Sequence, residues 1–477
     1  NIEDVDGAEY MLDHRMEGCF CFVCTKKIGS MENARALLRE GDKNIRIISE
    51  ICNVGPFRET IVGLCLQPVL TEYDKDYHIL IQGIVDEDGN EMQPMEYCLH
   101  TRPKAGEEPR YEKRDQVTLK VAREGIVLLK NEKHVLPFAQ EAKINVFGSG
   151  FAKFRIGASG AGRINPRYQI RLFEGIENYT SLKINPELRK FYAEATDTLP
   201  EEDVLKRAVD YADTAILALT RGTSENFDNL AFKGEFYLTD EEERLIEKVS
   251  RTFSHTVLLL NTGYPVDGRC VEKYGIDAVL WTGLCGMNGG RAVAEILAGT
   301  VNPSGKLPMT FPRNMGQIPI YYNHFSTGRP LTGTDPQRFV SKYTDAPNTP
   351  LFPFGYGLSY AEFSYSDVSL SSDSLTSKDS ITASVQLKNT GACTGTEVVQ
   401  LYIQDVAAST VRPVRELKGF TRITLTPGET QTVSFRISEA ELSFHRADGS
   451  YGTEPGTFRV WIGGSSATEN GTGFTLR

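Results

Sequence analysis

Between residues 113 and 358, short apolar runs alternate with helix-like segments. The runs have strand-like lengths and end in turn signals, and they are residues 144–148, 214–219, 256–261 and 278–281. Segments 240–250 and 289–298 instead repeat apolar residues at helical spacing. Because buried parallel strands read as continuous apolar runs joined by helices, this alternation predicts a mostly parallel α/β sheet with flanking helices. Thr239, three residues ahead of Glu242, predicts a capping box that opens the first helix.

Residues 361–477 follow a different pattern, with apolar and polar residues alternating at a period of two. The β-rich runs are residues 380–387, 398–403, 430–437 and 457–462. Turn signals rich in Gly, Asn and Pro separate them, at 389–391, 426–428 and 454–456. No helical period appears, so the pattern predicts a small antiparallel sandwich of about seven strands.

Residues 1–112 match neither pattern. Three strand-like segments, at 44–51, 59–70 and 77–85, indicate only a small β-containing module. A chain of 477 residues is expected to hold about three domains at ~150 residues each. We therefore expect a β-containing module (1–112), an α/β domain (113–358) and an all-β sandwich (359–477).

The composition excludes several kinds of partner. A formal net charge of −11 argues against nucleic acid and anionic membranes. No apolar run approaches the ~20 residues that a membrane-spanning helix needs. The nine cysteines are odd in number and scattered, which favours free thiols in a reducing compartment and hence the cytoplasm. Because the chain begins at Asn1 rather than Met, a processed start and a periplasmic or secreted location stay open.

Two stretches invite a metal or a cofactor. Cys19, Cys21 and Cys24 lie close together near His14, but a zinc site normally needs a second ligand pair at set spacing, and none follows. The glycines between 148 and 162 suggest a phosphate loop, yet a dinucleotide fingerprint must open a helix directly after its strand. Pro166 discourages a continuous helix there. We expect no metal and no cofactor.

Glu225 is the acidic residue with the most informative position. It lies on a loop just past the apolar run 214–219 and ahead of the helix that begins near Asp240. A rigid α/β scaffold can aim such a loop carboxylate into a cleft at the carboxyl edge of its sheet. On position alone, a solvated loop acid is the commoner interpretation of such a residue, and only the residues around Glu225 favour a catalytic role.

The residues around Glu225 resemble the acid/base loop of glycoside hydrolase family 3. Family members often read Arg-x-Ser-Gly-Glu-Gly-x-Asp-Arg and then Gly-[Asp/Glu]-Phe-Tyr-Leu, and this chain has related residues at 221–229 and 234–238. Further segments similar to the family, in the family's order, are 121–131, 302–312, 351–360, 415–420 and 425–429. The resemblance is to β-glucosidase-type members. It implies an α/β sandwich domain over 113–358 and a fibronectin-type-III-like domain over 359–477.

The resemblance also implies roles for particular residues. Glu225 matches the catalytic acid/base and Asp228 a structural aspartate, although Ser224 and Asn226 stand where the family has glycines. The glycine-rich loop matches one that approaches the sugar in the family, with Ala161 in place of a serine. Ser159 and Arg163 are the remaining polar candidates for sugar binding, and a purely structural role for this loop is an equal alternative.

The family's nucleophile is an Asp, usually in Ser-Asp-Trp, on a separate (β/α)8 barrel. The two tryptophans, Trp281 and Trp461, are not in such a motif, and residues 1–112 are too few for a barrel of about 250 residues. We therefore expect the acid/base part of a retaining β-glycosidase that acts on a β-glucoside or related oligosaccharide, with the barrel elsewhere in the gene or on another chain. The alternative is a non-catalytic carbohydrate-binding or assembly protein built on the same domains.

Overall fold

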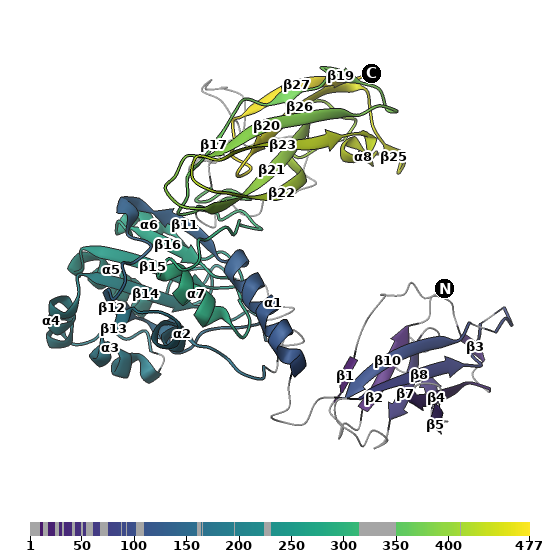
Figure 1. Cartoon of the computed structure of the whole chain (residues 1–477), viewed down its shortest axis with the longest axis horizontal. Coiled ribbons are helices and arrows are strands. Elements are labelled where there is room, and N and C mark those ends of the chain that lie inside the picture. Colours follow the sequence, from purple (N-terminus) through teal and green to yellow (C-terminus); the bar gives the residue numbers. More distant parts are fainter. Residues whose placement is uncertain are drawn as a thin grey trace. The chain divides into compact units, whose positions relative to one another are not determined.

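The computed structural model describes residues 109–477 apart from 160–163, 165, 195, 224–229, 314–349 and 411. Before residue 109 it describes 10–12, 18–23, 28–30, 33–40, 43–48, 51–53, 61–66, 75–86, 88–91 and 93–101. The chain divides into two compact units, Asn1–Arg114 and Asp115–Arg477, and each is described by itself (Figure 1). Every helix in the described ranges is too short or too polar to cross a lipid bilayer.

The described residues up to Thr101 form β-strands and short connections between them. The strands are β1 (Tyr10–Leu12), β2 (Gly18–Val23), β3 (Ile28–Ser30), β4 (Arg35–Glu40), β5 (Lys43–Ile48), β6 (Ile51–Asn53), β7 (Ile61–Leu66), β8 (Asp76–Gln82), β9 (Val85–Asp86) and β10 (Met95–Thr101). One sheet has the order β1-β10-β8-β4-β5 and another β2-β7-β6, while β3 pairs with β9. The expected β-containing module is confirmed, and its three predicted strands correspond to β5, β7 and β8. The other strands were not predicted. Strands as short as β6 and β9 leave little room for an alternating pattern, whereas β2, β4 and β10 have six or seven residues each and were missed despite their length.

The second unit begins with a six-stranded sheet. Its strands are β11 (Val127–Asn131), β12 (Lys143–Phe147), β13 (Lys183–Ile184), β14 (Thr214–Thr220), β15 (His255–Asn261) and β16 (Ala278–Trp281), in the order β11-β16-β15-β14-β12-β13. All neighbours are parallel except β11, which runs antiparallel to β16. The inner residues of β14 are all buried, as expected for a strand covered on both faces. The mostly parallel sheet predicted from the apolar runs is confirmed.

Helices connect and cover this sheet (Figure 1). They are α1 (Pro109–Gly125), α2 (Leu172–Tyr179), α3 (Pro186–Phe191), α4 (Glu202–Tyr211), α5 (Asp240–Thr252), α6 (Arg269–Lys273) and α7 (Gly289–Leu297). Helix α5 packs against β14 and β15, and α2 packs against α7. The predicted capping box is present: Thr239 Oγ1 accepts from the backbone N–H of Glu242, and Glu242 Oε2 accepts from that of Thr239. The core they enclose includes the fully buried Val146, Leu217 and Leu258.

An all-β sandwich completes the second unit. Its elements are β17 (Phe363–Tyr365), β18 (Ser369–Leu370), β19 (Ser374–Leu375), β20 (Ile381–Asn389), β21 (Gly395–Asp405), β22 (Glu416–Leu425), β23 (Thr430–Ile437), α8 (Glu439–Leu442), β24 (Phe444–His445), β25 (Tyr451–Gly452), β26 (Gly456–Gly463) and β27 (Gly471–Leu476). One sheet joins β17, β18 and β23 to β20, and the other has the order β19-β27-β26-β21-β22. The sandwich is confirmed.

Three details of the sandwich differ from expectation. Its described residues contain eleven strands, β17 to β27, rather than about seven. The short helix α8 was not predicted, because one helical turn is too short to show a helical period; a capping box between Ser438 and Glu441 supports it instead. The edge strand β19 pairs with β27 in parallel rather than antiparallel orientation. The core between the sheets is apolar and includes Val385, Val399 and Val460.

Candidate active site

The structure describes only part of the predicted site. Glu225 and Asp228 fall in the stretch 224–229, and Arg163 in 160–163, so these three residues lie outside the described residues. Ser159 is described and exposed. The segments that lead into and out of the Glu225 loop are also described, and their contacts define where that loop begins and ends.

The Glu225 loop leaves the sheet at its carboxyl edge. Strands β14 and β15 are parallel neighbours, and their last residues, Thr220 and Asn261, lie opposite one another. Just past β14, the backbone N–H of Arg221 donates to the carbonyl of Asn261 over 3.1 Å. In an open α/β sheet, ligands bind beyond this edge of the strands. The loop therefore starts at the edge where chemistry is expected.

Asn261 holds three loops together at this edge. Its side chain is fully buried, and its Oδ1 accepts from the backbone N–H of Arg155 (2.5 Å) and from Thr220 Oγ1 (3.1 Å). Its Nδ2 donates to the carbonyl of Arg155 (3.0 Å) and to that of Gly283 (2.8 Å). The loops after β12, β14 and β16 are thus fixed to one side chain. We did not predict this role; the available signal was a polar residue at the end of an apolar strand.

A buried ion pair anchors the leading stem of the loop. The guanidinium of Arg221 binds both carboxylate oxygens of Glu242 in α5, and the two residues are 7% and 1% exposed. Burial opposes the charge of Arg221, but the hydrogen bond to Glu242 and its negative charge outweigh burial and raise the pKa of the guanidinium. Glu242 also caps α5, so one carboxylate fixes the loop stem to the start of the helix.

The trailing stem is tied back to the leading stem. The backbone N–H of Leu230 donates to Glu235 Oε2 over 2.6 Å, and the carbonyl of Leu230 accepts from the N–H of Phe236 over 3.3 Å. Arg221 Nε donates to the carbonyl of Glu235 over 3.3 Å. Both ends of the stretch 224–229 are therefore connected to the same buried guanidinium.

Ser159 connects the glycine-rich loop to the Glu225 loop. Its backbone N–H and its Oγ both donate to the carbonyl of Thr223, over 2.9 and 3.0 Å. The hydroxyl of Tyr264 donates to the neighbouring carbonyl of Gly222 over 3.3 Å. Ser159, a predicted sugar-binding residue, therefore contacts Thr223, which lies two positions before Glu225 in the sequence.

The glycines at 148 and 150 serve packing rather than phosphate binding. A Cβ on Gly148 or Gly150 would lie 2.6 or 2.8 Å from the carbonyl oxygen of Ala218 in β14, and Gly148 has a φ of 94°. Only the three-residue 3₁₀ helix Ser149–Phe151 follows, where a dinucleotide loop needs an α-helix. This close approach explains the glycines without a nucleotide.

The carboxyl group of Asp197 contacts the start of the glycine-rich loop. Asp197 Oδ1 accepts from the backbone N–H of Ser149 over 2.7 Å. Burial raises the pKa of Asp197, the Glu242 charge adds to the rise, and the hydrogen bond from Ser149 and the charge of Arg221 oppose it. No local pattern points to this residue, because it lies in an irregular segment 48 positions from Ser149 along the chain.

No metal cluster is found among the residues that the structure describes. Cys19 and Cys21 belong to β2, whereas Cys24 and His14 lie outside the described ranges.

Comparison with known families assigns this arrangement to a class. Residues 126–360 match the glycosyl hydrolase family 3 C-terminal domain, and residues 397–466 match a fibronectin type III-like domain. The α/β sandwich that carries these loops is therefore a domain of the glycosyl hydrolase family 3 C-terminal type, and a fibronectin type III-like domain follows it. The chain belongs to glycosyl hydrolase family 3.

Individual relatives agree with this assignment. The chain is 39% identical over 378 residues to a periplasmic β-glucosidase of Salmonella typhimurium, covering 75% of this chain and 49% of that protein. It is 34% identical to the thermostable β-glucosidase B of Acetivibrio thermocellus, covering 72% and 46%. β-Glucosidase 3B of Thermotoga neapolitana in complex with glucose superposes with a TM-score of 0.66 at 31% identity, covering 77% and 55%. The chain spans about half the length of the curated relatives it matches.

Proposed function

We propose that this chain is the acid/base-bearing part of a retaining β-glycosidase that cleaves β-glucosides or related oligosaccharides, with Glu225 as the acid/base. The observation that supports this most directly is the anchoring of both stems of the Glu225 loop at the carboxyl edge of the sheet, by Arg221 and Ser159. A general acid must be held in position, and stems fixed by buried contacts supply that. The relatives named above are β-glucosidases, and one was solved with glucose.

In this proposal Glu225 first protonates the glycosidic oxygen and later deprotonates the water that releases the glycosyl-enzyme. A carboxylate about 5–5.5 Å away acts as nucleophile in a retaining enzyme. We propose that it comes from a (β/α)8 barrel, encoded in the same gene or on another chain. Ser159 and Arg163 would contact the sugar from the glycine-rich loop, and no cofactor takes part.

The same proposal includes the domain division 1–112, 113–358 and 359–477, with the acid/base loop in the middle domain. It also keeps the cytoplasm as the location, on the cysteine argument, with a location outside the cytoplasm, either periplasmic or secreted, as the alternative. One relative is named a periplasmic β-glucosidase. Cell fractionation with an antibody to the chain separates the two locations.

Two assays test the activity. The isolated chain should hydrolyse aryl β-glucosides negligibly, since its sequence contains no Ser-Asp-Trp motif to supply the nucleophile. Robust turnover by the pure chain would contradict the inference that the nucleophile is missing from it. In a form that carries the barrel, Glu225→Ala should slow substrates with poor leaving groups by about 10²–10⁴-fold, and azide should partly restore turnover of activated substrates.

The matched control is Glu241→Ala, which removes an exposed carboxylate from the first turn of α5. This variant should hydrolyse substrates with poor leaving groups and activated substrates at unchanged rates. A flat dependence on leaving group for Glu225→Ala, without azide rescue, would favour the non-catalytic alternative.

A further inference from the structure

A cavity of about 360 Å³ lies between the segment that follows the Glu225 loop, helix α5 and helix α6. Its volume is within the ~300–1,000 Å³ typical of small-molecule sites. Ser159, the one predicted sugar-binding residue within the described ranges, does not line it. The lining residues are Lys233, Tyr237, Leu238, Glu243, Asp267, Arg269, Cys270 and Lys273.

The cavity has a rigid, partly apolar floor. Leu238, Asp267 and Cys270 are buried. The backbone N–H of Asp267 donates to the carbonyl of Phe236 over 2.8 Å, which joins two of the walls. Burial raises the pKa of the Cys270 thiol to about 12, so this sulfur stays a neutral part of the floor.

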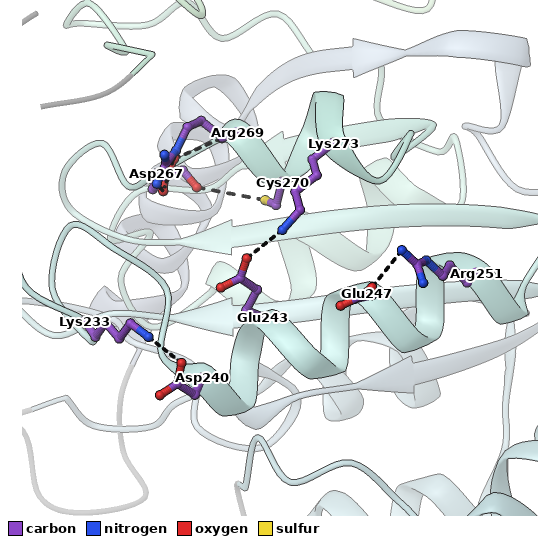
Figure 2. Close-up of polar contacts among 9 residues, drawn as sticks. All are labelled: Lys233, Asp240, Glu243, Glu247, Arg251, Asp267, Arg269, Cys270 and Lys273. Atoms are coloured by element: carbon purple, nitrogen blue, oxygen red, sulfur yellow. Dashed lines mark hydrogen bonds and ion pairs between the residues drawn. The ribbon is translucent and has the colours of Figure 1, made fainter. Parts of the chain in front are cut away.

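Members of three ion pairs line the cavity, and Figure 2 shows these pairs. Arg269 Nε lies 2.8 and 2.9 Å from the two carboxylate oxygens of Asp267, and Lys273 Nζ lies 2.9 Å from Glu243 Oε1. Lys233 pairs with Asp240 at the start of α5. The three cationic side chains are well exposed, so they have donors left for a ligand.

An aromatic wall stands beside these pairs. The guanidinium of Arg269 lies 5.5 Å from the centre of the Tyr237 ring, and Phe236 packs against the same ring edge-on at 5.2 Å. The ring is therefore held in place by its neighbours. A fixed aromatic surface next to paired polar groups offers both an apolar contact and directed hydrogen bonds.

The pairing of charges determines what kind of ligand fits. Each cation is already neutralised by a carboxylate, so a phosphate or carboxylate ligand would gain little and would face Glu243 and Asp267. A hydroxyl group can donate to a carboxylate and accept from the neighbouring cation at the same time, without breaking the pair. A neutral polyhydroxylated ring meets these requirements, and its C–H faces suit Tyr237.

We propose that this cavity binds a neutral saccharide unit. This goes beyond the proposed function, because binding here requires neither Glu225 nor turnover. Through Lys233 and Tyr237 the bound sugar would contact the segment that continues from the trailing stem of the Glu225 loop.

Isothermal titration calorimetry of the whole chain tests the proposal, with glucose, cellobiose and xylobiose as probes and inorganic phosphate as the anionic comparison. At least one saccharide should bind the unmodified chain. Arg269→Gln and Lys273→Met should each weaken that binding by about tenfold or more, since hydrogen bonds to charged groups are the strong ones. Both side chains are exposed, and thermal melting checks that each variant is folded; if one fails, the other is read alone.

Arg251→Met is the matched control. Arg251 pairs with Glu247 on the same helix α5 but lies outside the cavity lining (Figure 2), so binding should not change. Absence of saccharide binding, or equal affinities in all variants, would overturn the proposal. Phosphate binding lost in Arg269→Gln would show an anion site instead. Loss of saccharide binding in Glu225→Gln alone would place the sugar at the Glu225 loop. A failed turnover assay would not affect these measurements.

Discussion

Replacing Arg221 with Met should destabilise the α/β domain far more than replacing an exposed arginine. The substitution leaves the carboxylate of Glu242 buried without its partner, since that residue is 1% exposed. Breaking a buried pair from one side typically costs about 3–5 kcal/mol. At about 2–4 °C per kcal/mol for a domain of this size, the midpoint of thermal unfolding should fall by roughly 6–20 °C.

The chain offers its own reporter for this measurement. Trp281 ends β16 in the α/β domain and Trp461 lies in β26 of the sandwich, and these are the two tryptophans of the sequence. In a Trp461→Phe background, fluorescence follows the α/β domain through Trp281 alone. Urea and thermal unfolding of this form, with and without Arg221→Met, then give the change in stability.

Two further variants test whether the unpaired buried carboxylate causes the loss of stability. Arg207→Met removes an exposed arginine that binds Glu187 in a similar two-point geometry, and it should give no resolvable shift in the midpoint. Adding Glu242→Leu to Arg221→Met should restore part of the stability, because an apolar pair avoids the stranded charge. A remainder of about 0.5–2 kcal/mol should stay lost, since Glu242 also caps α5. If Arg221→Met behaves like Arg207→Met, or the double variant is simply additive, the buried-charge reasoning is wrong.

The remaining predictions concern Asn261 and Cys270. Asn261→Leu should cost about 1–3 kcal/mol for each buried group left unpaired, among them the N–H of Arg155 and the carbonyl of Gly283; a change below 1 kcal/mol in the Trp281 assay would mean that water replaces the amide. Because burial raises the pKa of Cys270 to about 12, its thiolate forms only as the pH approaches that value, so at neutral pH iodoacetamide should modify exposed Cys393 much faster than Cys270. Peptide mapping by mass spectrometry measures this, and equal rates in the folded protein would contradict it.

Local patterns were enough to predict the central strands of both domains of the second unit and two of its helices. The apolar runs at 214–219 and 256–261 correspond to β14 and β15, and the period-two run at 380–387 corresponds to β20. Thr239 and Glu242 lie three residues apart, so a single helical turn encodes the capping box. These features depend on neighbours in sequence, which is why one chain suffices to predict them. The family motifs add the assignment of Glu225, which stays a prediction.

The sequence did not show which distant residues meet. Glu242 was identified as a capping residue, but nothing local shows that its carboxylate also binds Arg221, 21 positions away. The amide of Asn261 and the backbone of Arg155 are 106 positions apart. Strand β11 pairs in antiparallel orientation with β16, and β19 pairs in parallel with β27. In both pairs the partner strand lies about 100 or more residues further along the chain, so no local pattern shows the pairing.

The amino-acid pattern alone was thus sufficient for the fold class of the second unit and for the loop expected to carry the acid/base. The three-dimensional fold was needed to show how the stems of that loop are held, why Gly148 and Gly150 must be glycines, and which charged residues line the cavity between α5 and α6. The physical reason is that strand and helix patterns arise from burial repeated along one segment, whereas buried polar contacts are satisfied by whichever group the fold brings within hydrogen-bonding distance.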